Sequence, residues 1–167
     1  MELERAEIIA NKVKDRLKPY CERIEIAGSI RRKRPFVHDI DLVCIPSNQG
    51  QFVYQLQMLG KITMGGQKLI RVKHPDIELD VYVATPKTWA TLLLIRTGSK
   101  QHNIMLCKRA RDMDYKLHAD GSGLFKINYH KIGMDTEYST DERIAGDTEQ
   151  SIFEVLGMKY KRPEERE

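Results

Sequence analysis

Long apolar runs and paired cysteines are both missing from this sequence of 167 residues. No segment approaches the ~18 consecutive apolar residues of a membrane-spanning helix, and the amphipathic, charged start of the chain is unlike a signal peptide. The three cysteines lie far apart, with no CxxC pair and no histidines at zinc-ligand spacing, at Cys21, Cys44 and Cys107. We therefore expect reduced thiols, no membrane partner and an intracellular location, cytoplasmic, nucleoid-associated or inside a virus-infected host cell.

Charge of one sign is not in large excess, because 28 Lys and Arg residues face 24 Asp and Glu residues, a formal net charge of +4. With 41% apolar and 31% charged residues, the composition is that of an ordinary globular protein of one domain or two small ones. The basic residues cluster, however, in the run 31–34 and again at Lys108, Arg109 and Arg111. Such clusters indicate a polyanionic partner, although a solvated loop gives the same pattern.

Hydrophobic periodicity predicts a mixed α+β chain. Apolar residues at helical spacing predict helices over 3–17, 51–59, 88–96, about 99–112 and 148–156. Short apolar runs predict strands over 24–27, 40–45, 69–73, 77–84, 115–118 and 124–127, the last followed by a polar loop. This order predicts a mixed-sheet domain over residues 1–98 and a smaller α+β module over residues 99–167.

Three local interpretations accompany this pattern. Asp147 with Gln150 is a candidate cap for the last helix, which Gly157 would end. Trp89 lies in an apolar helical segment, which favours a place in the core over a base-stacking platform. The C-terminal KRPEERE is a polar tail unless another part of the protein docks it.

Two acids in the strand HDIDL carry the first chemical signal. Side chains alternate along a strand, so Asp39 and Asp41 project from one face, roughly 7 Å apart. Like charges this close are costly unless a cation lies between them, and hard divalent ions such as Mg²⁺ prefer oxygen ligands. A polar edge of a half-buried strand would show the same spacing.

A third acid lies in the later strand IELDVYV, where Asp80 interrupts residues suited to burial. If the two strands pair, three acids can hold two metal ions about 3.5–4 Å apart, which activates an attacking oxygen and stabilises a leaving phosphate oxygen. Glu78 projects from the same face and is the competing third ligand.

A glycine-serine pair stands upstream of the acids. Gly28 would let backbone amides approach a ligand, and the Ser29 hydroxyl can donate to a phosphate oxygen. Arg31, Arg32 and Arg34 follow, and guanidinium groups match phosphate geometry. A simple turn is the alternative meaning of the Gly-Ser pair.

In combination these motifs resemble a known superfamily. AGSIRRKRPFVHDIDLVCIP followed by ELDVYV is similar to the signature of polymerase β-like nucleotidyltransferases. RTGSKQHNIMLCKRAR resembles the threonine-glycine-serine segment of family X DNA polymerases, and HADGSGLF and TEQSIFEVLGMKYKRPEERE resemble that family's thumb and C-terminal end. The resemblance spans the whole chain and implies a palm followed by a thumb.

The resemblance also implies roles for individual residues. Asp39, Asp41 and Asp80 would be the catalytic ligands of two Mg²⁺ ions, for which Mn²⁺ would substitute. The residues implied to contact an incoming deoxynucleoside triphosphate are Gly28, Ser29, Arg32, Gly98, Ser99 and Asn103. Those implied to contact DNA, as primer-template or gapped duplex, are Arg31, Lys33, Lys108, Arg109 and Arg111. The implied reaction, by a monomer, is addition of deoxynucleotides to a primer 3′-hydroxyl in short gaps during DNA repair.

Three positions depart from the family pattern. Ile95-Arg96 stands where relatives commonly have an aromatic pair, which leaves the choice between ribose and deoxyribose open. His38 stands where many relatives have glycine, and Glu78 where some have a basic residue. The chain also begins about where the palm of larger relatives begins, so we expect no lyase activity. The alternative functions are template-independent transfer to nucleic-acid ends and a catalytically silent nucleic-acid-binding protein. The intact set of acids argues against the silent protein.

Overall fold

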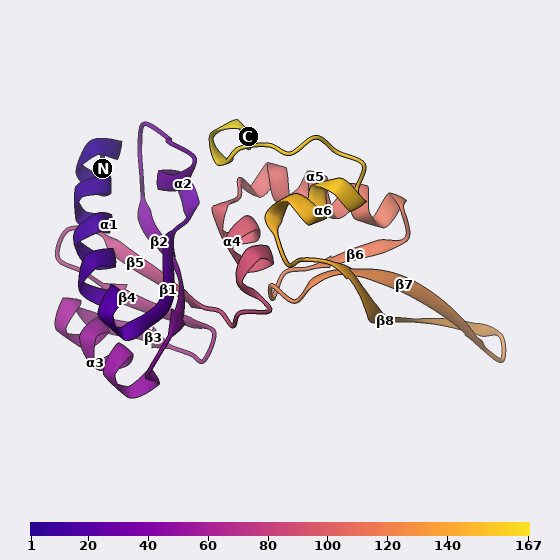
Figure 1. Cartoon of the computed structure of the whole chain (residues 1–167), viewed down its shortest axis with the longest axis horizontal. Coiled ribbons are helices and arrows are strands. Elements are labelled where there is room, and N and C mark those ends of the chain that lie inside the picture. The colour runs from indigo at the N-terminus through magenta and orange to yellow at the C-terminus, as the bar shows by residue number, and fades with distance from the viewer.

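The computed structural model describes residues 1–167 as an elongated molecule of two lobes (Figure 1). A five-stranded sheet lies in the first lobe and a three-stranded sheet in the second. Helix α4 (Trp89–Thr97) lies between the two lobes. The α+β class expected from the sequence is confirmed, including the mixed sheet.

The sheet of the first lobe has the strand order β1-β2-β5-β4-β3, in which β2 and β5 run parallel and all other neighbours run antiparallel. Its strands are β1 (Cys21–Ile26), β2 (Asp39–Pro46), β3 (Lys61–Gly65), β4 (Leu69–Lys73) and β5 (Glu78–Val83). Helices α1 (Leu3–Leu17) and α3 (Gln49–Leu59) pack on this sheet, and the short α2 (Gly28–Arg31) connects β1 to β2.

The apolar spacing of α1 explains its place on the sheet. Ala6, Ala10, Val13 and Leu17 lie on one helical face and are all buried in the core of the first lobe, together with strand residues such as Leu42. The helix begins and ends where the sequence predicts. Burial of this single stripe therefore fixes the orientation of the first element of the chain.

Helix α4 contributes to two cores at once. Trp89, Leu92 and Leu93 pack with Val43 of β2 in a cluster on the face of the first sheet. Leu94, by contrast, belongs to the core of the second lobe. Trp89 is 5% exposed, which confirms the core interpretation of this residue.

The second lobe combines two helices with an antiparallel sheet of order β6-β7-β8. Its elements are α5 (Lys100–Asp112), β6 (Tyr115–His118), β7 (Gly123–Ile132), β8 (Asp135–Ala145) and α6 (Glu149–Val155). The far ends of β7 and β8 project beyond the lobe as a hairpin (Figure 1).

The hairpin corrects one sequence expectation, because the predicted polar loop after residue 127 is a pair of strands. Pairing of β7 with β8 runs from Leu124 opposite Ala145 to Ile132 opposite Asp135. This segment has too few apolar residues to give a strand signal by alternation. Its threonines and tyrosines nevertheless favour strands, and cross-strand pairs stabilise them.

The start of α6 is a second correction. The Thr148 hydroxyl accepts a hydrogen bond from the backbone N–H of Ser151 at 3.0 Å, so Thr148 is the N-cap and not Asp147. The Asp147 carboxylate is instead paired with Arg143 at 2.8 Å. Gly157 follows the helix with a φ of 63°, as predicted.

The cysteines form no disulfide in the structure. Cys21, Cys44 and Cys107 are all free thiols. Burial raises the pKa of the Cys44 thiol well above its ordinary value, which keeps it protonated. No helix of the structure has both the length and the apolar character needed to cross a bilayer.

A buried group of ion pairs joins the two lobes. Arg31 of α2 donates from Nη1 and Nη2 to the two carboxylate oxygens of Glu149, each at 2.9 Å, and from Nη1 to the Thr97 hydroxyl. Arg166 is fully buried, donates to Glu149 at 3.0 Å and lies over the Phe153 ring. The C-terminal segment is therefore docked. We call Arg31, Glu149 and Arg166 the interlobe ion pairs.

Removing the central carboxylate tests how far these pairs hold the lobes together. We expect Glu149→Ala to lower the free energy of unfolding by about 3–5 kcal/mol, because it leaves two arginines without their counter-charge in a buried site. Urea unfolding at neutral pH measures the change. Glu154→Ala, at an exposed position of the same helix, is the matched control and should change stability little. Equal losses in the two variants would contradict the assigned role.

Candidate active site

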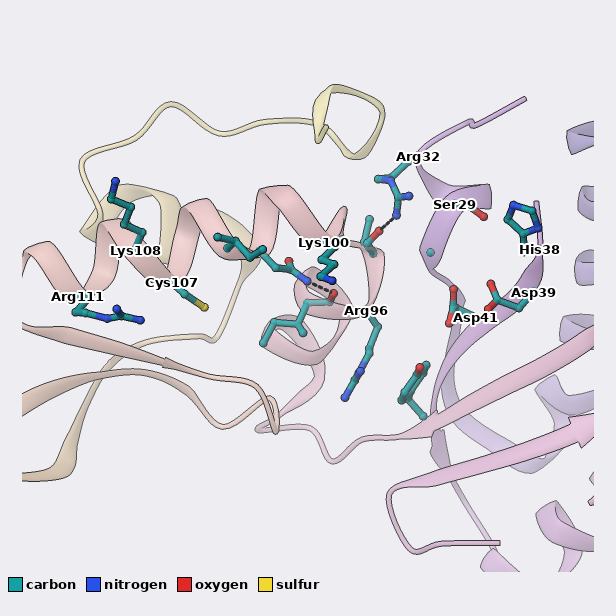
Figure 2. A pocket seen from close by; sticks show the side chains of 17 residues that line it. Ser29, Arg32, His38, Asp39, Asp41, Arg96, Lys100, Cys107, Lys108 and Arg111 are labelled. Atoms are coloured by element: carbon teal, nitrogen blue, oxygen red, sulfur yellow. Dashed lines mark hydrogen bonds between the residues drawn. The ribbon is translucent and has the colours of Figure 1, made fainter. Parts of the chain in front are cut away.

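A cleft of about 800 Å³ lies between the lobes and collects residues from both (Figure 2). Strand β2 contributes Asp39 and Asp41, and α2 contributes Gly28 and Ser29. The opposite wall is the end of α4 and one face of α5. The cleft therefore sets acidic side chains of the first lobe against a basic helix of the second.

Parallel pairing of β2 with β5 brings the predicted acids together. Asp41 stands opposite Asp80 and Asp39 opposite Glu78 on strands that lie about 4.8 Å apart. Because side chains alternate, all four acids project from the same face of the sheet. The sequence-based expectation that a paired strand places Asp80 beside the first two acids is confirmed.

The Asp41 carboxyl group lies in an unfavourable environment for its charge. Burial raises its pKa to about 7, and the negative charges of Asp39 and Asp80 add to this effect. The more distant guanidinium groups of Arg96 and Arg32 oppose the shift only in part. A cation beside these carboxylates would relieve the repulsion, and carboxylate oxygens are the ligands that hard divalent ions prefer. The two acids on β2 thus fit such an ion.

The third acid is held by an arginine that sequence reasoning missed. Arg71 of β4, opposite Asp80 in the sheet, donates from Nε and Nη2 to the two Asp80 oxygens at 2.6 and 2.7 Å. Asp80 is 3% exposed, and the hydrogen bonds from Arg71 to Asp80 raise the arginine's pKa. Arg71 also pairs with Glu78 at 3.2 Å, which directs that competing acid to the Arg71 side.

The carboxylates do not form a complete metal site by themselves. No group of three His, Cys, Asp or Glu side chains lies close enough together to hold an ion. Asp39 and Asp41 face the cleft, whereas Asp80 faces Arg71. The role of all three as ligands therefore stays a prediction, in which Asp80 joins the other two.

Glycine is required at position 28 because the acid on the neighbouring strand leaves no room. Gly28 has a φ of +59°, and a Cβ atom built on it would lie 1.9 Å from Oδ2 of Asp41. The next residue, Ser29, has a buried hydroxyl oxygen without a hydrogen-bond partner. The backbone of this short helix thus lies directly against Asp41, and the Ser29 hydroxyl lines the same cleft.

Unpaired polar atoms gather around the cleft. Ser29 Oγ, Arg32 Nε, Arg96 Nε and Asn103 Oδ1 are all buried without a partner, and all four residues line the cavity. Buried polar groups are nearly always hydrogen-bonded in folded proteins, so a concentration of unpaired ones calls for a ligand. The unpaired atoms include guanidinium N–H donors suited to an anion.

The remaining predicted nucleotide-binding residues shape the wall formed by the second lobe. The Ser99 hydroxyl caps α5 by accepting from the His102 backbone N–H at 3.2 Å, and Asn103 Nδ2 donates to the Ile95 carbonyl at 2.8 Å. A Cβ atom at Gly98 would lie 3.1 Å from the Arg32 guanidinium, which itself donates to the Thr97 carbonyl. The structure brings Gly98 and Asn103 to the cleft, whereas the Ser99 side chain serves the helix end.

One stacked pair in this wall was not expected. The Arg96 guanidinium lies over the Tyr82 ring at 4.3 Å, and both side chains line the cleft. Arg96 stands where an aromatic residue is common in the family that the sequence resembles. No local pattern pairs it with Tyr82, because β5 and α4 meet only through the fold. His38 is exposed at the same cleft.

The predicted DNA-contacting residues fall into two groups. Lys108 and Arg111 lie on α5 and line the cleft. Arg31 departs from the expectation, because its guanidinium is taken up by the interlobe ion pairs. Lys33 is paired with Glu7, and Arg109 donates to the Leu156 carbonyl. Of the five predicted DNA-contacting residues, Lys108 and Arg111 of α5 thus bring their charge to the cleft.

The comparisons agree with this arrangement. Residues 92–167 match the family model of the DNA polymerase beta thumb. Among solved structures, polymerase beta of Leishmania infantum in a ternary P/T complex matches with a TM-score of 0.80 and 24% identity, over 100% of this chain and 76% of that chain. The chain therefore shares the fold of that polymerase beta structure, and its second lobe matches the thumb model. The Leishmania infantum enzyme in a ternary gap complex matches with a TM-score of 0.82 and 23% identity, over 100% and 70% of the two chains. No curated protein matches the chain.

The region that matches the thumb model begins within α4. That helix precedes the domain boundary after residue 98 which the sequence suggests, and it packs against both lobes.

The like charges of the acid cluster predict a gain in stability when one is removed. We expect Asp41→Asn to raise the melting temperature in EDTA. Burial lifts the pKa of Asp41 in the folded protein to about 7, whereas its ordinary pKa is 3.8. Above the ordinary pKa, the unfolded chain is therefore stabilised by ionisation more than the folded protein is. The gain should be larger at pH 8 than at pH 5. Differential scanning fluorimetry measures it, with Asp15→Asn on α1 as the control. A lower melting temperature would contradict the assigned charge repulsion.

Proposed function

We propose that this chain is a Mg²⁺-dependent nucleotidyltransferase that adds deoxynucleotides to a primer 3′-hydroxyl on DNA, in short gaps of the kind met in repair. The observation that supports it best is the composition of the cleft. Two acids of β2, one of them opposite Asp80 on the paired strand β5, face a cavity in which buried hydroxyl and guanidinium groups lack partners. This combination fits a substrate that carries phosphates and binds together with divalent cations.

The acids divide into two tasks in this proposal. Asp39 and Asp41 would hold Mg²⁺, or Mn²⁺ in its place, from the floor of the cleft. Divalent ions at such a site lower the pKa of an attacking hydroxyl and stabilise charge on phosphate oxygens. Asp80 would lie nearest the primer hydroxyl. Arg71 would fix the orientation of the Asp80 carboxylate through its two hydrogen bonds.

The triphosphate would lie across the acids from the first lobe to the second. Ser29 would donate its hydroxyl hydrogen to a phosphate oxygen, since Oγ of Ser29 has no hydrogen-bond partner in the protein. Arg32 would offer its free Nε–H in the same direction while its Nη1 stays on the Thr97 carbonyl. Gly98 and Asn103 border the end of the cavity nearer α5 and would contact the sugar and base.

Primer extension tests the reaction and the role of the third acid together. On gapped and recessed duplexes with Mg²⁺, we expect native protein to add templated deoxynucleotides and Asp80→Asn to lower the rate by about 100-fold or more. Glu78→Gln, on the same face of β5 and paired with the same Arg71, is the matched control. Tailing of single strands would favour the template-independent alternative. No incorporation on any DNA or RNA substrate would overturn the proposal.

Arg71 gives a separate prediction about positioning. We expect Arg71→Gln to lower kcat by roughly tenfold while KM for the nucleotide stays near the native value, because the variant loses orientation of Asp80 and not a substrate contact. Arg71→Lys should recover part of the rate at neutral pH and a smaller part at high pH, because lysine can lose its charge. Lys73→Gln, at the end of β4, is the control. A change confined to KM would show that Arg71 binds substrate.

A further inference from the structure

The cleft continues into a second cavity along one face of α5. Cys107 and Arg111 line both cavities, while Lys100, Asn103 and Ile104 line the first at helical spacing on the same face. Figure 2 shows Lys100, Cys107 and Arg111 in sequence along this helix. From Lys100 to Arg111 an α-helix rises ~16 Å, the length of about five stacked nucleotides at the rise of B-form DNA. The face is thus long enough for a strand to lie along it.

Tyrosines dominate the second cavity, which has a volume of about 520 Å³. Tyr115 of β6, Tyr129 of β7 and Tyr138 of β8 all line it. Tyr129 and Tyr138 are cross-strand partners and are 58% and 59% exposed, so their rings are open to a partner. Tyr129 and Tyr138 belong to β7 and β8, the strands whose far ends project from the second lobe (Figure 1).

Positive charge accompanies the rings. Lys116 Nζ lies 5.6 Å from the centre of the Tyr138 ring, and Arg111 lines the cavity from α5. The acid in contact is Asp114, whose Oδ1 accepts a hydrogen bond from the Tyr129 hydroxyl at 3.4 Å. The cavity therefore offers aromatic faces beside two cations, and the nearby Asp114 carboxylate is directed to the Tyr129 hydroxyl.

We propose that this tyrosine groove, defined by Tyr115, Tyr129, Tyr138, Arg111 and Lys116, binds unpaired nucleotides of a single strand. Bases stack on aromatic side chains whatever their sequence, and cations beside the rings neutralise the phosphates. A duplex keeps its base faces inside and would leave the exposed rings unused. An apolar protein segment would leave the two cations without counter-charges.

The groove would hold the single-stranded part of a template that enters the active-site cleft, because Cys107 and Arg111 border both cavities. This placement of the strand rests on the proposed function. Binding of a single strand to the groove does not, since it needs neither metal nor nucleotide. The two proposals are therefore separable by experiment.

Fluorescence anisotropy with a labelled oligothymidine, in EDTA and without nucleotide, tests the groove. We expect Tyr129→Ala and Tyr138→Ala each to raise Kd by about tenfold, and the phenylalanine variants at both positions to bind like the native protein, because stacking needs only the ring. Tyr54→Ala is the matched control, because Tyr54 is 57% exposed and lies on α3 in the other lobe. Because both tyrosines are exposed, we expect the variants to remain folded, and circular dichroism checks this.

Three results would overturn the groove: native affinity in both alanine variants, a loss as large in the phenylalanine variants, or the same loss with a blunt duplex. Primer extension on recessed templates separates this inference from the proposed function. Tyrosine-dependent binding without any extension would overturn the proposed function alone. Normal extension on long overhangs by the double alanine variant, with native binding, would overturn the groove alone.

Discussion

The parallel pairing of β2 with β5 is the constraint on which the candidate site depends. It sets Asp41 beside Asp80 across one strand spacing and leaves Asp39 on the same face. Two neighbouring residues are determined by that cluster of negative charge. Position 28 must be glycine because Asp41 fills the space of a side chain, and Arg71 neutralises Asp80 from the next strand. Asp39 and Asp41 instead line the cleft, where our proposal places a divalent ion.

The cleft and the interlobe ion pairs differ in how well their polar groups are satisfied. The cleft holds like charges and unpaired polar atoms, both of which oppose folding. The interlobe ion pairs, by contrast, are fully satisfied, with Glu149 accepting from Arg31 and Arg166. Two adjacent arginines of one short segment therefore differ in role: Arg31 joins the lobes, and Arg32 keeps a free donor at the cleft. A loss of stability at a functional site is a common cost of activity.

The sequence allowed prediction of those features that depend on local pattern. The stripe of α1, the alternation that aligns Asp39 with Asp41, and the burial of Trp89 all follow from spacing within one element. What it did not predict depends on partners distant in the chain. Arg71 is an ordinary strand residue until β4 pairs with β5, and β8 has no apolar alternation of its own until β7 lies beside it. Arg31 gave a phosphate-binding pattern, yet a glutamate over a hundred positions away determines its use.

Helix α4 sits in a position with consequences for how such a molecule is assembled. Its Trp89, Leu92 and Leu93 complete one core and its Leu94 another, so neither lobe has a full interior without this helix. Unfolding should then be a single cooperative transition and not two independent ones. For the same reason the lobes are poor modules for exchange: a chimaera cut on either side of α4 would leave a gap in one of its two cores, and only a graft that carries the helix with matching surfaces on both sides would fold.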